Sequence, residues 1–274
     1  MTLRDRISMT GLTDTGLVRE HNEDCIGLRP ELGLLVLADG MGGLKAGEVA
    51  SAMAVEVITA ELEGELKKIT VTGHDEATGY AFESLAVGRA ITKANASIFG
   101  VAQSQPQCAG MGTTLVVGLF YDNRLTVGHV GDSRMYRLRA GELEQVTSDH
   151  SLVQELVNRG FYTQEEARTA ANRNIVTRAL GIGAEVNIDM QEEVALVGDL
   201  YLLCSDGLND MIDDERIRTI LMGNQGNLDA AAKALVDAAN GEGGRDNVSV
   251  LMARIDRPFP VKTGWFRRLV SWFD

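Results

Sequence analysis

The chain has 274 residues, and its 26 lysines and arginines against 39 aspartates and glutamates give a formal net charge of −13. Apolar residues make up 45% of the sequence and charged residues 24%, which is typical of a globular protein with a buried core and excludes disordered and fibrous classes. The negative charge repels phosphate backbones and anionic lipids, so the body of the protein is not expected to bind nucleic acid or a membrane through its general field.

The three cysteines, Cys25, Cys108 and Cys204, lie far apart and form no CxxC pair. This pattern indicates neither a zinc nor a redox site and favours a reducing compartment, so we predict a cytoplasmic protein. Residues 1–9 lack the apolar run of a signal peptide. The longest apolar stretches have the length of buried strands rather than of a membrane span.

In the first part of the chain, residues 8–39 are predicted to form short strands, the last of which is the apolar run 34–38. Residues 44–68 carry apolar side chains at the three-and-four spacing of a helix, and a second helix is predicted from about 76 to 103. These two helices are expected to pack as an antiparallel pair.

Beyond residue 112 the pattern returns to short apolar runs joined by tight turns, which favour antiparallel pairing. The predicted strands are 113–121, 125–130, 134–138, 143–146, 188–194, 199–204 and 248–255. A polar stretch, 150–180, reads as an excursion from the sheet, and two helices are predicted at about 213–222 and 227–239. Strands joined by hairpins, with helices in separate blocks, indicate an α+β fold in which helices cover antiparallel sheets.

Four aspartates, Asp39, Asp132, Asp206 and Asp246, each stand at the end or start of an apolar strand. A single Asp-Gly dipeptide is more often a turn, but four such sites at one sheet edge would repel one another unless cations lay between them. Since the neighbouring candidate ligands are all oxygens, Mg²⁺ or Mn²⁺ is favoured over zinc.

The segment 16–24 places Arg19 close to Glu23 and Asp24 in one loop. An arginine beside a metal cluster suits a phosphoryl substrate, because its planar guanidinium binds two phosphate oxygens at once. The alternative is a surface loop of ion pairs.

Seven motifs in order make the chain resemble the metal-dependent protein phosphatases of type 2C (the PPM family), in particular the compact bacterial serine/threonine phosphatases. The motifs are Arg-Glu-His-Asn-Glu-Asp at 19–24, Ala-Asp-Gly-Met-Gly-Gly at 38–43, Gly-Thr-Thr at 112–114, Gly-Asp-Ser-Arg at 131–134, Thr-Arg-Ala-Leu-Gly at 177–181, Ser-Asp-Gly at 205–207 and Gly-Arg-Asp-Asn at 244–247. The resemblance covers roughly residues 8–255. It implies one phosphatase domain over 1–256 with a four-layer αββα sandwich, two antiparallel sheets flanked by helices.

The resemblance also implies a set of site residues. Two Mn²⁺ or Mg²⁺ ions would be held by the side chains of Asp39, Asp206 and Asp246 and the carbonyl of Gly40. Glu23 and Asp24 would hold waters bound to the ions, and Asp132 matches the ligand of a third ion. Arg19 would bind the substrate phosphate, and the catalytic set would be Arg19, Asp39, Asp206 and Asp246.

The implied reaction is hydrolysis of phosphoserine and phosphothreonine on proteins, by in-line attack of a water that bridges the two ions. Members outside bacteria often carry a histidine, assigned as the acid for the leaving oxygen, where this chain has Met41. A methionine donates no proton, although bacterial relatives commonly have it. We therefore hypothesise that a water on the ion held by Asp132 is the acid.

Residues 148–176 align with the flap of this family, a segment beside the active site that varies between members. Asn172 and Arg173 are candidates for substrate contact, with solvated loop residues as the alternative. A cysteine-based phosphatase is excluded, because no cysteine has an arginine six positions later. Aspartyl-phosphate chemistry is also excluded, because no Asp-x-Asp occurs.

Two other functions fit the sequence less well. A non-catalytic phosphoprotein reader requires broken metal ligands, and none is broken. The related phosphatases of bacterial stress control usually carry added sensor domains, which the chain is too short to hold. The expected partners are phosphorylated proteins and a cognate serine/threonine kinase, and the protein is expected to be a monomer.

The last segment, 257–274, holds both tryptophans and three of the seven phenylalanines. On a helix its aromatic residues share one side while Arg267 and Arg268 face elsewhere. It is predicted to be an amphipathic tail that either docks on the domain or makes a peripheral contact with a membrane or a protein.

Overall fold

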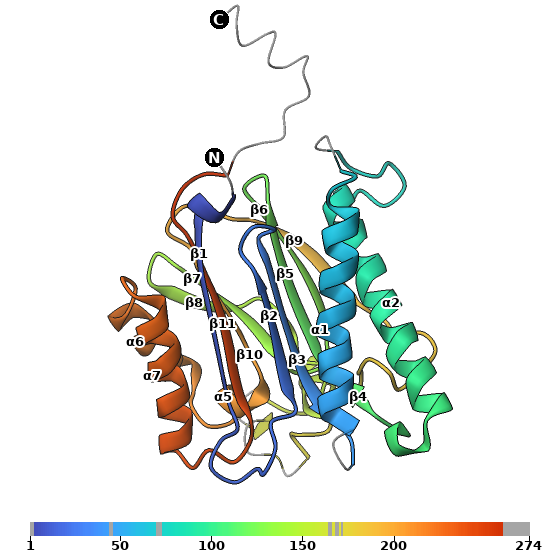
Figure 1. Ribbon diagram of the computed structural model, residues 1–274. Helices are drawn as coiled ribbons and strands as arrows, with labels where there is room; N and C mark the ends of the chain where they lie inside the picture. Colours follow the sequence, from blue (N-terminus) through green and yellow to red (C-terminus); the bar gives the residue numbers. More distant parts are fainter. Residues whose placement is uncertain are drawn as a thin grey trace, which may run out of the picture.

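The computed structural model describes residues 3–43, 46–69, 73–163, 166–167, 170 and 172–259. Two antiparallel sheets lie face to face between two layers of helices (Figure 1). The first sheet contains, in spatial order, β1 (Ile7–Asp14), β11 (Val248–Ile255), β10 (Leu200–Cys204), β7 (Arg134–Arg139) and β8 (Glu142–Gln145). The second contains β2 (Asp24–Arg29), β3 (Leu34–Met41), β5 (Leu115–Tyr121), β6 (Arg124–Val130) and β9 (Asp189–Val194), with β4 (Gly112–Thr113) paired to the end of β3.

The long helices cover the outer faces of the sheets. Helices α1 (Ala46–Glu65) and α2 (Phe82–Ser104) run antiparallel over the second sheet, as predicted, and α6 (Asp214–Gly223) and α7 (Leu228–Gly241) cover the first (Figure 1). The shorter elements are η1 (Leu3–Asp5), η2 (Pro106–Cys108), α3 (Leu152–Asn158) and α5 (Asp206–Asn209). The predicted α+β fold with four αββα layers is therefore confirmed.

The apolar run at 34–38 is buried on both faces of β3. Leu35 and Leu37 point into the core between the two sheets. Leu34, Val36 and Ala38 point to the other side and pack under α1 and α2. Because successive side chains of a strand point to opposite faces, an inner strand of a four-layer sandwich has to be apolar at every position.

Two predicted boundaries were wrong. Helix α2 begins at Phe82 rather than near 76, because the Asp75 carboxylate accepts hydrogen bonds from the backbone and hydroxyl of Thr78 and so stabilises a turn. The predicted strand 113–121 is interrupted at Thr114, whose backbone N–H donates to the carbonyl of Asp39. Helix α5 was not predicted at all.

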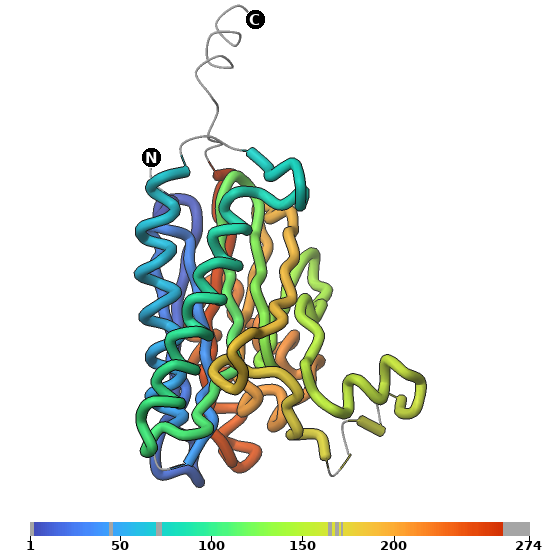
Figure 2. Tube along the Cα trace, turned by 90° about the vertical axis from the view of Figure 1, so that its right-hand side faces the viewer, coloured from blue at the N-terminus to red at the C-terminus, as the bar shows by residue number. Residues whose placement is uncertain are grey.

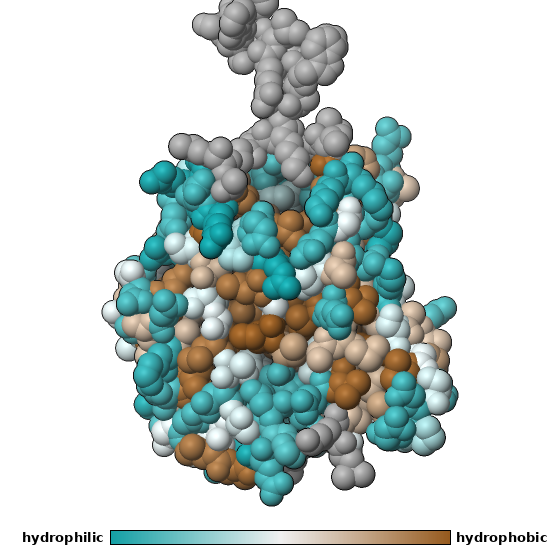
Figure 3. Space-filling model, viewed as in Figure 1, coloured by the Kyte–Doolittle hydropathy of each residue, from teal (hydrophilic) through white to brown (hydrophobic). Residues whose placement is uncertain are grey.

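The polar stretch that follows β8 leaves the sandwich, as expected. It contains α3, and Figure 2 shows this yellow-green segment extending away from the sheets. In Figure 3 an apolar band crosses the middle of the face in view, between the two helical layers. Among the described helices, none has the length and apolar character needed to cross a bilayer. Of the predicted tail 257–274, residues 260–274 lie outside the described part.

Candidate active site

Strands β2 and β3 bring the first group of predicted site residues together. Asp24 and Asp39 are register partners across the two strands. The backbone N–H of Gly40 donates to the carbonyl of Glu23 at 3.1 Å, and the hydroxyl of Ser51 on α1 donates to the same carbonyl at 2.6 Å. These bonds fix Glu23, Asp24, Asp39 and Gly40 at one end of the second sheet.

The first sheet contributes the second group from two adjacent strands. Asp206 begins α5 shortly after β10, and Asp246 lies just before β11, which pairs with β10. The Ser205 hydroxyl donates to Asp24 Oδ2 at 2.8 Å and accepts from the Ser249 N–H. A bond between residues 181 positions apart in the sequence therefore joins the ends of the two sheets.

Asn247 makes the most extensive of these connections. Its Oδ1 accepts from the N–H of Glu23 at 2.8 Å, and its Nδ2 donates to the carbonyls of Thr15 and His21, both at 2.9 Å. Neither Asn247 nor Ser205 is predicted as a site residue from the sequence, although both lie inside motifs that carry predicted ligands. The sequence signal that could have indicated them is an amide or hydroxyl side chain directly beside a predicted ligand.

Asp132 comes from the loop between β6 and β7 and is 8% exposed. The neighbouring Ser133 hydroxyl hydrogen-bonds the Thr114 hydroxyl at 2.7 Å. Thr114 in turn donates its backbone N–H to the carbonyl of Asp39 at 2.9 Å. This chain of contacts ties the Asp132 loop to the end of β3.

Burial, and then repulsion between neighbours, raises the pKa values of several carboxylates in the cluster. The pKa values of Asp39 and Asp206 lie well above the usual range, first because surrounding protein atoms desolvate the carboxylates and then because neighbouring aspartates repel them. Asp24 repels both of them, and Asp132 and Asp246 do so as well. Burial raises the pKa of Asp24 and of Asp132 to about 6, and it also raises the pKa of Glu23.

The positively charged side chain of Arg19 lies at the edge of this cluster. Its Nη2 lies 2.6 Å from Asp246 Oδ2, and its side chain is half exposed. This hydrogen bond is the main reason that the pKa of the guanidinium is raised. Since a guanidinium has five N–H donors, the pair with Asp246 leaves donors that a phosphate can use.

Across the described part of the chain, no three His, Cys, Asp or Glu side chains are arranged as a ready-made metal site. The residues nevertheless fit hard divalent cations. Asp24 Oδ1 is buried without a hydrogen-bond partner. A Cβ at position 40 would lie 2.2 Å from the Gly47 carbonyl oxygen, so only glycine fits against this end of the site. Every donor on the cluster is an oxygen, as Mg²⁺ and Mn²⁺ prefer.

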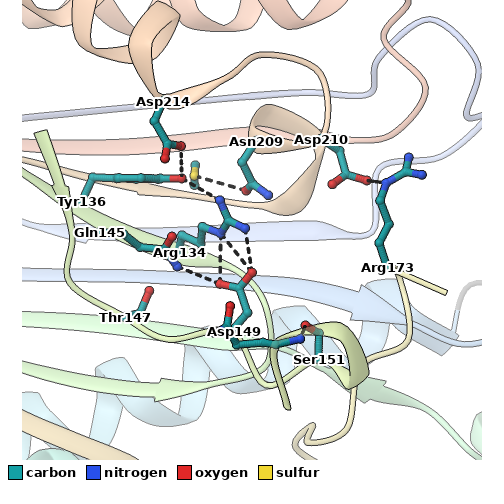
Figure 4. Close-up of polar contacts among 12 residues, drawn as sticks. Arg134, Tyr136, Gln145, Thr147, Asp149, Ser151, Arg173, Asn209, Asp210 and Asp214 are labelled. Carbon is teal, nitrogen blue, oxygen red and sulfur yellow. Dashed lines mark hydrogen bonds and ion pairs between the residues drawn. The ribbon is translucent and has the colours of Figure 1, made fainter. Parts of the chain in front are cut away.

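A cavity of about 510 Å³ opens beside the cluster. Asp132 and Asp206 line it, together with residues of the flap and of the α5–α6 segment. Figure 4 shows Arg134 in a bidentate pair with Asp149, with Nη2 2.7 Å from Oδ2. From the flap, Arg173 Nε lies 3.6 Å from Asp210 Oδ2. Arg173 therefore lines the cavity that leads to the carboxylates.

Comparisons with known proteins agree on one family. A family model described as "Protein phosphatase 2C" matches residues 19–239. The "Serine/threonine protein phosphatase PstP" of Mycobacterium tuberculosis (strain H37Rv) is 42% identical over 245 residues, 89% of this chain and 44% of the relative. The chain thus spans less than half of the mycobacterial protein.

Two further matches cover nearly the whole of the chain compared. The "Serine/threonine phosphatase stp" of Listeria monocytogenes (strain EGD-e) is 35% identical over 247 residues, 89% of this chain and 94% of the relative. The crystal structure of the PstP catalytic domain in complex with two manganese ions superposes with a TM-score of 0.78 at 38% identity, covering 91% of this chain and 98% of that chain.

Proposed function

This chain belongs to the protein phosphatase 2C family, as the sequence motifs predicted, and we propose that it is a metal-dependent phosphatase that hydrolyses phosphoserine and phosphothreonine on proteins. One observation carries the proposal. Carboxylates from both sheets meet at one end of the sandwich, with Arg19 at their edge. The names of the relatives, which are serine/threonine phosphatases, support the same class of enzyme.

We assign the cation ligands as the family resemblance implies. Asp39, Asp206, Asp246 and the Gly40 carbonyl are proposed to hold two Mn²⁺ or Mg²⁺ ions, with Glu23 and Asp24 holding waters around them. Asp132 is proposed as the ligand of a third ion. When bound, the ions supply positive charge to the transition state and lower the pKa of an attacking water to near neutrality.

The chain's own residues orient the substrate. Asp246 holds one edge of the Arg19 guanidinium, so the remaining N–H donors are aimed rather than free to rotate. They are proposed to bind the equatorial phosphate oxygens, where charge increases in the transition state. Met41 has no proton to give, and a water held at the Asp132 carboxylate is proposed to protonate the leaving serine or threonine oxygen.

The finer aspects of function are proposals too. Three free cysteines support a reducing compartment such as the cytoplasm, and burial raises the pKa of the Cys204 thiol to about 12, which makes it unreactive. We propose phosphoproteins as substrates, a cognate serine/threonine kinase as the opposing enzyme, and a monomer as the working form. A peripheral contact through residues 257–274 stays a prediction.

The test is phosphate release from a phosphothreonine peptide by the protein, by Asp39→Asn and by Asp206→Asn, with Mn²⁺ present. We expect both variants to lose at least about 1,000-fold in kcat/KM, since charge stabilisation by a metal is worth several kcal/mol and each 1.4 kcal/mol is tenfold. Asp237→Asn, which removes an exposed carboxylate paired with Lys233 on α7, is the matched control. Wild-type turnover that both active-site variants retain would refute the assignment, and binding of the peptide without turnover by any form would make the protein a phosphoprotein reader.

A further inference from the structure

His150 stands at the start of the flap and holds the peptide that precedes Asp132. Its backbone N–H donates to the carbonyl of Gly131 at 2.8 Å, and its ring Nδ1 accepts from the N–H of Gly131 at 3.1 Å. Both backbone polar groups of Gly131 are therefore bonded to one residue. The side chain of His150 is only 5% exposed, so these bonds are shielded from water.

Gly131 needs such support because its backbone has a conformation that other residues rarely adopt. Its φ is +111°, and a Cβ at this position would lie 2.6 Å from the Thr114 side chain. Glycine alone tolerates this conformation. Glycine also has more alternative backbone conformations than any other residue. The direction of the following Asp132 side chain depends on which of these alternatives is held.

The contacts of His150 determine its tautomer. A backbone N–H can only donate, so Nδ1 must be without a proton and the neutral ring carries its proton on Nε2. Nε2 lies 3.0 Å from Asp189 Oδ2, which accepts this proton in a hydrogen bond. Arg178 Nη1 approaches Nε2 at 3.3 Å, but as a donor it bonds Asp189 Oδ1, 2.8 Å away.

The surroundings hold the ring in this orientation. The ring of buried His129 packs against it with the centroids 4.5 Å apart. Burial lowers the pKa of His129 to about 3, so this neighbour is neutral. The carbonyl of His150 accepts from the N–H of Thr177, where the flap returns to the sandwich. One residue thus joins the base of the flap to the Asp132 loop.

We propose that His150 is a positioning residue for Asp132: its Nδ1 holds the Gly131 peptide in the conformation that directs the Asp132 carboxylate into the site, while Asp189 fixes the tautomer that makes this possible. The inference rests on the proposed phosphatase function for its kinetic consequence. It does not depend on that function for its structural consequence, because the orientation of Asp132 also governs how tightly a cation is held.

Two amide substitutions separate positioning from packing. In His150→Asn the amide oxygen takes the place of Nδ1 and keeps the acceptor for Gly131, whereas in His150→Gln the polar atoms lie near the position of Nε2. We expect kcat with Mn²⁺ to fall about 10- to 100-fold in His150→Gln, with KM for the phosphopeptide little changed, and to stay within about threefold of wild type in His150→Asn. The same two substitutions at exposed His74 are the control, and thermal melting of every variant reports folding.

Two readouts are independent of turnover. Calorimetric titration with Mn²⁺ should show at least about tenfold weaker binding of one ion in His150→Gln and wild-type binding in His150→Asn. NMR of wild-type protein with ¹⁵N-labelled histidine should show the Nε2–H tautomer for His150, even if a variant fails to fold. The proposal is overturned if His150 has the Nδ1–H tautomer or if both variants show equal defects. It is also overturned if His150→Gln has the kcat and Mn²⁺ affinity of the wild-type protein. A wild-type protein without turnover would refute the phosphatase function alone, since the titration and the tautomer would still decide the role of His150.

Discussion

The end of the sandwich where the carboxylates meet and the flap beside it are held in different ways. At the carboxylate end, Asn247 and Ser205 make hydrogen bonds between residues 181 to 232 positions apart in the sequence. The described part of the flap is held mainly at its base, where Ser151 pairs with Val176, and where Asp149 and His150 bond the sandwich at Arg134 and Gly131. Beyond the base, Arg173 pairs with Asp210. A region held by many long-range bonds opens only with the whole fold, whereas one held at its base can move by itself.

The two regions therefore suit different roles. The cross-linked end has the rigidity that phosphoryl transfer needs, because catalysis of this kind depends on positioning and charge. Beyond its base, where His150 bonds Gly131 next to Asp132, the flap can adapt to different substrates without disturbing the carboxylates. The predictions below test whether the two regions are as separate as their bonding suggests.

Arg19→Ala should have the largest effect among them. It removes the guanidinium proposed to bind the phosphate oxygens, and loss of one such donor typically costs about 100- to 1,000-fold in rate. Steady-state kinetics with a phosphothreonine peptide measures this, and Arg216→Ala, which removes an exposed arginine paired with Glu242, is the control. Equal activity of the two variants would contradict the role of Arg19.

Asn247→Ala should weaken the connection between the two sheets at the site, where the bond from Ser205 to Asp24 remains. It removes three hydrogen bonds, to Glu23, Thr15 and His21, and leaves their backbone groups without partners. We expect a loss of about 2–3 kcal/mol in the free energy of unfolding and about 10- to 100-fold in kcat. Chemical denaturation and kinetics check both. A variant with wild-type stability would show that the cross-link is not what holds this end together.

Asp132→Asn tests the source of the leaving-group proton. If a water held at this carboxylate protonates the leaving oxygen, the variant should lose about tenfold or more on a phosphothreonine peptide relative to p-nitrophenyl phosphate, whose leaving group needs no proton. Parallel assays of the two substrates give the ratio. An unchanged ratio would remove Asp132 from this step.

The metal-free protein should show the cost of its clustered carboxylates. The pKa of Asp24 is about 6 in the folded state, above the value near 3.9 of an unfolded aspartate, so the folded state holds the proton more tightly. Its contribution to stability is therefore present below about pH 4 and lost as the pH rises to about 6. In EDTA, the Tm of Asp24→Asn should rise relative to wild type by a few degrees across this window. A Tm difference that stays constant with pH would contradict the raised pKa.

Arg173→Ala should have the smallest effect if the flap is separate from the chemistry. Its ion pair with Asp210 lies in the cavity beside the carboxylates and is partly exposed, and pairs of that kind contribute little to stability. We expect kcat on p-nitrophenyl phosphate to stay within about threefold of wild type. A loss comparable to that of Arg19→Ala would show that Arg173 takes part in catalysis. The flap and the carboxylate end would then not be separate.

Much of this molecule could be predicted from local pattern alone. The run 34–38 is apolar on both faces because β3 lies inside the sandwich, and aspartates next to such runs marked the site. The local pattern did not reveal the turn at Asp75, where a side chain competes with helix formation, or the one-turn helix α5. Neither element has enough residues to show a period.

The contacts that assemble the site could not be predicted in this way. The bond from Ser205 to Asp24 and the bonds of Asn247 join residues that only the folded sheets bring together. The motifs predict Asp39, Asp206 and Asp246 as cation ligands, and this stays a prediction. The residues that hold these segments in place were not predicted. Contacts between distant segments depend on sheet register, which hydrophobic periodicity does not specify for the pairing partner.

The most direct test of the account is removal and return of the metal. Phosphate release from a phosphothreonine peptide would be measured with Mn²⁺, after EDTA, and after dialysis and renewed addition of Mn²⁺. We predict turnover with Mn²⁺, none above background after EDTA, and recovery after renewed addition of Mn²⁺. The Asp206→Asn variant should be inactive in all three states. Turnover that persists in EDTA would contradict the claim that the carboxylates at the end of the sandwich work by holding cations.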